Sequence, residues 1–82
     1  MIKHNEITDS ELRIILKEKK VSYGGNLKLK IYGRLDCKSG KRMKKENRVF
    51  FLSQIAAINQ GFRPCGHCLF NDYKIWKNEN NR

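Results

Sequence analysis

The sequence predicts a small α+β domain in which helices flank a short antiparallel sheet. Three observations lead to this prediction: some stretches have the spacing and caps of helices, others have the composition of strands, and they follow one another as helix, strands, helix, turn and helix. A chain of 82 residues can hold one small hydrophobic core. We therefore expect a single domain over residues 1–82, with its core within about 8–77 and a polar tail at 78–82.

The first helix is expected from about Asp9 to Lys19 or Lys20. The segment "TDSE" (8–11) fits a capping box, in which Thr8 binds the amide of Glu11 and Glu11 reaches back. Apolar residues follow at helical spacing: Leu12, Ile15 and Leu16.

Two strands are expected in the middle of the chain. "YGGN" (23–26) has the composition of a turn, and "LKLKIY" (27–32) alternates apolar and basic residues like a half-buried strand. "GRLDCKSGKRMKKEN" (33–47) has no clean period and is interpreted as a long loop. "RVFFL" (48–52) then predicts a buried strand.

Two further helices are expected after this strand. Ser53 can cap the first of them, and Gly61 fits its C-terminal end. A final short helix is indicated by aromatic residues that repeat every three positions. We expect the aromatic side chains to lie in the core rather than form a base-stacking platform: Phe50, Phe51, Phe62, Phe70, Tyr73 and Trp76.

The chain has three cysteines, and two of them are spaced like metal ligands. Cys65 and Cys68 lie three positions apart in "PCGHC", the spacing with which two thiolates converge on Zn²⁺. Cys37, 28 residues earlier, is the natural third ligand. The alternative is three thiols that pack as small hydrophobic side chains. We expect a zinc site at Cys37, Cys65 and Cys68.

The fourth ligand of such a site stays open at the level of sequence. Tetrahedral zinc needs one more donor, or a water that leaves the site open to chemistry. The candidates are His67, His4, Asp36 and water, with Ser39 close to Cys37.

The charge of the chain indicates a polyanionic partner. Eighteen Lys and Arg residues against eight Asp and Glu residues give a net charge of +10. Nucleic acid, and DNA in particular, is the expected partner, because each neutralised phosphate releases counterions. No apolar run approaches the roughly 20 residues of a membrane-spanning helix, and the N-terminus lacks the apolar core of a signal peptide. We expect a cytoplasmic monomer with no membrane partner and no evident small-molecule substrate.

The densest charge lies between residues 38 and 48, where six of eleven residues are Lys or Arg. A solvated loop is the alternative interpretation, but the run has almost one sign and begins beside a candidate metal ligand. We expect it to contact phosphates, which supplies affinity rather than sequence choice. The candidate contacts are Lys38, Lys41, Arg42, Lys44, Lys45, Arg48 and, from the cysteine turn, Arg63.

The segment "KKENRVFFLSQIAAINQGFRPCGHC" (44–68) resembles the metal-binding domain of the Ada methyl-phosphotriester repair proteins. The shared features are an "EN-x-V-x-F" strand, a short alanine-bearing helix and "GFRPC-x-x-C". The likeness covers about 30–68, and the chain is similar to short standalone copies of this domain. In that family four cysteines hold zinc. One of an earlier "C-x-x-x-C" pair accepts a methyl group from a DNA phosphate, and the methylated domain then binds promoter DNA more tightly.

Transferred residue by residue, the resemblance implies that Cys65 and Cys68 are the second pair and that Cys37 is the later cysteine of the first. Gly33 stands where the family has its other cysteine, or a histidine in nuclease-linked copies. This departure falls on the methyl-accepting position, so the resemblance implies zinc and DNA binding more than methyl transfer.

The leading hypothesis is therefore a zinc-binding, nucleic-acid-binding module linked to DNA repair or transcription regulation, rather than an enzyme. The alternatives are a methyl acceptor at Cys37 and a protein-interaction module that uses the helix of Tyr73 and Trp76.

Overall fold

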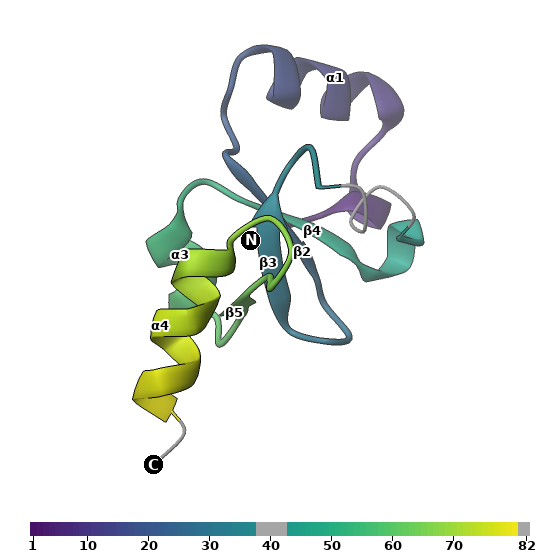
Figure 1. Ribbon diagram of the computed structural model, residues 1–82. Helices are drawn as coiled ribbons and strands as arrows, with labels where there is room; N and C mark the ends of the chain where they lie inside the picture. The colour runs from purple at the N-terminus through teal and green to yellow at the C-terminus, as the bar shows by residue number, and fades with distance from the viewer. Residues whose placement is uncertain (38–42, 81–82) are drawn as a thin grey trace.

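The computed structural model describes residues 1–37 and 43–80 and confirms the α+β class (Figure 1). Within these residues a five-stranded sheet has the order β1-β4-β2-β3-β5. The neighbours pair antiparallel except β3 and β5, which are parallel, so the sheet is mixed. The strands are β1 (Ile2–Lys3), β2 (Tyr23–Asn26), β3 (Ile31–Arg34), β4 (Arg48–Phe51) and β5 (Arg63–Pro64).

The segment "YGGN" forms strand β2, and the turn predicted there is wrong. β2 lies between β3 and β4, with Gly25 opposite both Tyr32 and Val49. A Cβ atom built on Gly25 would lie 2.9 Å from Cε2 of Phe51 and 3.1 Å from Cγ2 of Val49. Glycine is therefore present because bulky neighbours on β4 occupy the space of a side chain, not because the chain turns.

The strand predicted over 27–32 is also wrong in its first part, since residues 27–30 form the turn between β2 and β3. The Asn26 side chain accepts a hydrogen bond from the amide of Leu29 (3.0 Å), and the Lys30 amide donates to the Asn26 carbonyl (2.8 Å). Lys30 closes the turn with a left-handed φ of 58°. An asparagine that binds its own turn thus overrides the alternating pattern.

The hydrophobic core lies between the sheet and α3 (Gln54–Asn59). Its central residues are Tyr32, Val49, Phe51, Ala57 and Phe62. Ser53 caps α3 through the amide of Ala56 (3.2 Å), and Gly61 follows the helix with a φ of +83°. The buried strand predicted over 48–52 is confirmed for 48–51, while Leu52 lies outside it and is exposed. The cap and the glycine stop are as predicted.

Helix α1 (Asp9–Lys17) begins with the predicted capping box and ends two or three residues before the expected end at Lys19 or Lys20. The Thr8 hydroxyl accepts from the Glu11 amide (3.1 Å), and the Glu11 carboxylate accepts from the Thr8 amide (3.0 Å). The helix lies at the end of the molecule opposite the C-terminus (Figure 1) and buries none of its side chains.

Helix α4 (Phe70–Asn80) continues past residue 78, where the polar tail was expected to begin. The prediction that its aromatic residues lie in the core is wrong, because Phe70 is 58% exposed and Tyr73 and Trp76 are only half-buried. Tyr73 and Trp76 stack on each other with ring centroids 6.0 Å apart. Among the described helices, none has the length and apolar character needed to cross a membrane.

Candidate metal centre

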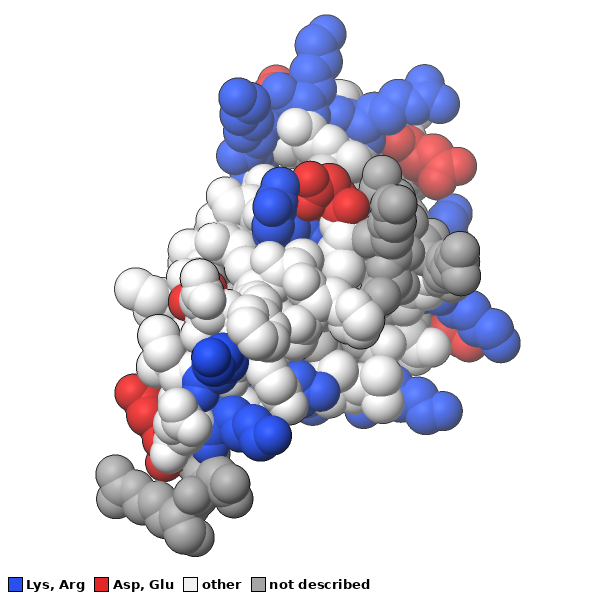
Figure 2. Space-filling view, viewed as in Figure 1, with Lys and Arg blue, Asp and Glu red and all other residues white. Residues whose placement is uncertain are grey.

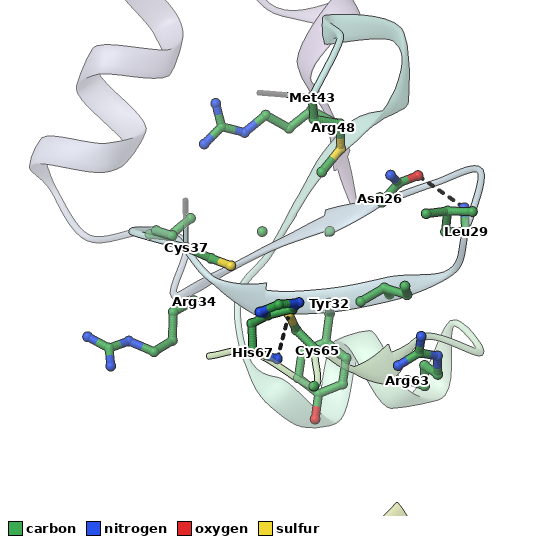
Figure 3. Close-up of a pocket in the computed structure, with 16 residues that line it drawn as sticks. Asn26, Leu29, Tyr32, Arg34, Cys37, Met43, Arg48, Arg63, Cys65 and His67 are labelled. Carbon is green, nitrogen blue, oxygen red and sulfur yellow. Dashed lines mark hydrogen bonds between the residues drawn. The ribbon is translucent and has the colours of Figure 1, made fainter. Parts of the chain in front are cut away.

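The fold brings the three cysteines together. Their sulfur atoms lie within 4.8 Å of one another, although 28 residues separate Cys37 from Cys65. Cys37 follows strand β3, and Cys65 and Cys68 lie in the turn between β5 and α4. Because β3 and β5 are adjacent and parallel, both chain segments leave the same edge of the sheet. In Figure 3 the side chains of Cys37 and Cys65 converge.

Backbone amides point at two of these sulfurs. The Arg34 amide donates to Sγ of Cys68 at 3.2 Å, and the His67 amide donates to Sγ of Cys65 at 3.4 Å. Such bonds stabilise negative charge on sulfur. Three convergent sulfurs with amides directed at them fit a metal that prefers thiolate ligands, such as Zn²⁺.

Strand β3 contacts the cysteine turn at Gly33, which has no side chain to hold the two apart. A Cβ atom built on Gly33 would lie 2.8 Å from Sγ of Cys68 and 3.1 Å from Cβ of Cys65. The glycine therefore allows the close approach that places Cys68 against the backbone of β3.

Without a metal, the protonated thiol of Cys68 is favoured. Burial, followed by the neighbouring thiols of Cys37 and Cys65, raises the pKa of Cys68 to about 12, although the Arg34 amide opposes the rise. A metal ion must therefore displace a proton from Cys68 when it binds.

The candidate fourth ligands lie outside this group of sulfurs. His67, His4 and Asp36 are not among the donor atoms that converge in the described residues. Residues 38–42 and 81–82 contain no Cys, His, Asp or Glu, so every side chain of those types lies in the described residues. Ser39 lies outside the described residues.

Two of these candidates have other contacts. The carboxylate of Asp36 accepts a hydrogen bond from Nη2 of Arg34 at 2.8 Å. His4 is only 8% exposed and packs against the Phe50 ring, with centroids 5.7 Å apart. Neither ring nitrogen of His4 has a hydrogen-bond partner among the described residues. Burial, then the nearby Arg48 and Lys45, lowers the pKa of His4.

The candidate phosphate contacts are distributed unevenly. Lys38, Lys41 and Arg42 lie outside the described residues. Lys45 forms an ion pair with Asp9 (3.1 Å), Arg48 stacks on Phe50 (5.2 Å), and Lys44 is exposed. The Arg63 guanidinium lies over the rings of Tyr73 (5.2 Å) and Trp76 (5.7 Å) and donates to the Pro64 carbonyl (3.0 Å). On the face in Figure 2, Lys and Arg side chains lie around the edge of an uncharged centre.

A cavity of about 350 Å³ adjoins the cysteines (Figure 3). Its lining includes two of the cysteines, Cys37 and Cys65, the apolar side chains of Leu29, Ile31, Leu35 and Met43, and Arg48. Sequence reasoning missed this cavity, because its apolar lining comes from separate turns and loops. The count of three cysteines and the departure at Gly33 were the signals that the centre differs from a closed site of four cysteines.

One comparison with known proteins gives a match. A family model described as the metal binding domain of Ada matches residues 18–69, well over half of the chain. No curated protein and no solved structure matches. The matched range includes all three cysteines and the strands β2, β3, β4 and β5.

Proposed function

The chain belongs to the family of the Ada metal-binding domain, and from this premise we propose that it is a small zinc-binding module that binds nucleic acid, with DNA as its partner. The three-cysteine group supports the metal, and its thiolate character favours zinc among the divalent ions. Cys37, Cys65 and Cys68 would hold the ion. A zinc centre would stabilise a domain whose core contains few residues.

The observation that carries the proposal is the position of the basic stretch. It begins directly after Cys37, which belongs to the sulfur group, and it ends at Arg48, the first residue of β4. A bound zinc would therefore fix the first end of this stretch, and the sheet already fixes the second. The net charge of +10 favours binding to a phosphate backbone. Because both ends of the basic stretch would be fixed, binding would cost less conformational entropy than it would for a free loop.

Within this stretch, Lys44 is free of carboxylate partners among the described residues, whereas Lys45 is held by Asp9. Arg48 is half-buried on Phe50 and Arg63 is engaged by Tyr73 and Trp76. We therefore assign phosphate contact first to Lys44 and its basic neighbours 38–42, and a more structural role to Arg63.

Fluorescence anisotropy of a labelled DNA duplex tests the proposal. Affinity should fall steeply between about 50 and 200 mM salt, with a slope near −0.9 for each phosphate neutralised. Stringent removal of zinc should weaken binding, because the start of the basic stretch is released. Binding that is insensitive to salt would contradict the proposal.

Two double variants that remove the same charge test whether binding depends on the position of the cations or only on the net charge. Lys41→Gln with Lys44→Gln should weaken binding at least about tenfold and reduce the salt slope by about two. Lys17→Gln with Lys77→Gln removes the same charge from α1 and α4 and should have a much smaller effect. Equal effects of the two pairs would show that only net charge matters.

A second function is favoured by the position of Cys37 at the cavity, where a phosphate ester could approach its sulfur. In methyl transfer the sulfur would form a bond to the methyl carbon, the carbon–oxygen bond would break, and a DNA phosphodiester anion would leave. Incubation with methyl-phosphotriester DNA followed by intact-mass measurement tests this step. One added methyl group on Cys37 supports it, and an unchanged mass excludes it.

A further inference from the structure

We propose that the metal of this centre takes its fourth donor from outside the chain, and that this donor is the sulfur of a small thiol with an anionic group, bound in the cavity beside Cys37 and Cys65. The inference rests on the zinc site of the proposed function and does not require nucleic-acid binding.

Among the described residues, the donors that converge are too few to close a tetrahedral shell. Three sulfurs converge, and none of the carboxylates or imidazoles joins them in the described residues, which contain every Cys, His, Asp and Glu of the chain. Structural zinc sites hold four ligands, whereas a site with three ligands from the protein keeps one position for an exogenous donor.

The missing donor corresponds to a specific position. The Cβ direction of Gly33 leads to Sγ of Cys68 at 2.8 Å and to Sγ of Cys65 at 3.9 Å, so a side chain at this position would be directed into the group. Glycine supplies no donor there. The Arg34 amide donates to Cys68 from β3, whereas Cys37 and Cys65 line the adjoining cavity.

The cavity lies on the side of Cys37 and Cys65. Its volume of about 350 Å³ is within the range of small-molecule sites, and Cys37 and Cys65 form part of its wall. The surface of the wall is mainly apolar, which suits a ligand with a short carbon body. Leu35 and Met43 provide two of these apolar contacts.

The charge of the ligand follows from Arg48. This residue lines the cavity and is half-buried, and burial lowers its pKa. Among the described residues it stacks on Phe50 but pairs with no carboxylate, whereas Arg34 pairs with Asp36 and Arg63 also donates to the Pro64 carbonyl. A partly desolvated guanidinium without a counterion favours a ligand that carries an anionic group.

The donor atom follows from the metal chemistry. A centre that already has three thiolates prefers another soft donor, and a thiol loses its proton readily when its sulfur binds zinc. On binding, a sulfur–metal bond would form and a water would leave the fourth position, while the S–H bond would break and the proton would go to the buffer. No electron is transferred, so no oxidant or reductant is needed.

The test uses the full chain loaded with Co²⁺, whose visible absorption reports coordination, and 3-mercaptopropionate as the probe. Titration should increase the sulfur-to-cobalt charge-transfer absorption by about one third, because three sulfur donors become four. Propionate, which lacks the thiol, should leave the spectrum unchanged. 2-Mercaptoethanol, which lacks the anionic group, should bind about tenfold more weakly.

Each alternative result has a distinct meaning. Bound Co²⁺ whose spectrum does not respond to the thiol would overturn the exogenous ligand and leave the metal-binding module intact. A chain that binds no Co²⁺ or Zn²⁺ would overturn the proposed zinc function itself. Equal affinity for the acidic and the neutral thiol would overturn the role of Arg48.

Two variants sharpen the experiment. Gly33→Cys displaces Cys68 as Gly33→Ala does, but it also adds a fourth thiolate where the side chain enters the group. Once Cys68 has shifted, the Co²⁺ form should show the four-sulfur spectrum without added thiol and should not respond to it. Arg48→Gln should keep the thiol response but lose the tenfold preference for the acid. If crowding by Cys68 prevents folding of the Gly33 variant, the titrations of the wild type and of Arg48→Gln still test whether the thiol binds the metal.

Discussion

A Cβ atom at Gly33 would lie 2.8 Å from Sγ of Cys68, which is closer than real Cβ atoms approach a sulfur. The contact joins strand β3 to the cysteine turn, and it places backbone rather than a side chain against the sulfur group. The position of the candidate metal centre therefore depends on one residue that contributes no ligand.

Gly33→Ala should lower metal affinity by about tenfold or more, because the added methyl group displaces the sulfur of Cys68. Competition with a chromogenic chelator measures the affinity. Gly66→Ala is the control within the cysteine turn, since its Cβ would make an ordinary contact of 3.5 Å with Tyr73. Equal affinities of the two variants would contradict the role of the close approach.

Gly25→Ala should lower the free energy of unfolding by about 1–3 kcal/mol, as overpacking of a buried sheet does. The new methyl group would lie 2.9 Å from the ring of Phe51, which is buried in the core and cannot easily move. Gly24→Ala, on the same strand, would meet its nearest atoms at 3.7 Å and should change stability little. Urea denaturation of the zinc-loaded proteins compares the two, and a larger loss for Gly24→Ala would contradict the packing argument.

Cys37→Ser should weaken metal binding by more than the roughly 10–100-fold that loss of an outer-shell partner costs. Native mass spectrometry should find one zinc ion per wild-type chain, and a much lower occupancy in the variant. Asp36→Asn is the matched control, because Asp36 adjoins Cys37 but lies outside the sulfur group. If Asp36→Asn lost as much zinc as Cys37→Ser, Asp36 would be a ligand.

Metal binding should release protons near neutral pH. Burial raises the pKa of Cys68 to about 12, so this thiol is protonated in the metal-free chain and must lose its proton to become a ligand. The affinity for zinc should therefore increase with pH. Calorimetry in buffers of different ionisation enthalpy counts the protons, and a count of zero would show that Cys68 is not a ligand.

The stability of the domain should decrease when His4 becomes charged. Burial and the nearby Arg48 and Lys45 lower the pKa of His4 in the fold below its ordinary value of 6.5. Because the folded pKa is the lower one, the stabilisation is present above the ordinary value and is lost as the pH falls through the folded pKa. His4→Phe keeps the ring contact with Phe50 and should remove this acid sensitivity.

Unfolding free energies of wild type and His4→Phe between about pH 7.5 and pH 5 provide the measurement. The difference between the two proteins should grow toward acid. Zinc must be saturating throughout, since loss of the metal at low pH would affect both proteins. A constant difference would show that His4 does not titrate with folding.

Local interactions explain what could be predicted from the sequence. The capping box at Thr8, the cap at Ser53 and the glycine after α3 each involve residues only a few positions apart, so their patterns are visible in one stretch of chain. The run 48–51 is apolar enough to indicate a buried strand without knowledge of its neighbours. The pair Cys65 and Cys68 likewise specifies a turn through its own spacing.

The strands that the sequence did not predict depend on contacts across the sheet. Whether two glycines form a turn or a strand depends on Phe51 and Val49, which lie more than twenty positions away and fill the space of a side chain at Gly25. The short strands β1 and β5 exist only because β4 and β3 offer edges to pair with, and two residues carry no period that a sequence pattern can show.

The sequence by itself determined the fold class, the charge, the caps and the residues able to bind a metal, because these follow from composition and from contacts within one turn of chain. Only the tertiary structure decided that Cys37 meets Cys65 and Cys68, that no other Cys, His, Asp or Glu of the described chain joins them, and that a cavity adjoins the group. The physical reason is that strand pairing between β3 and β5 brings together residues that share no local pattern.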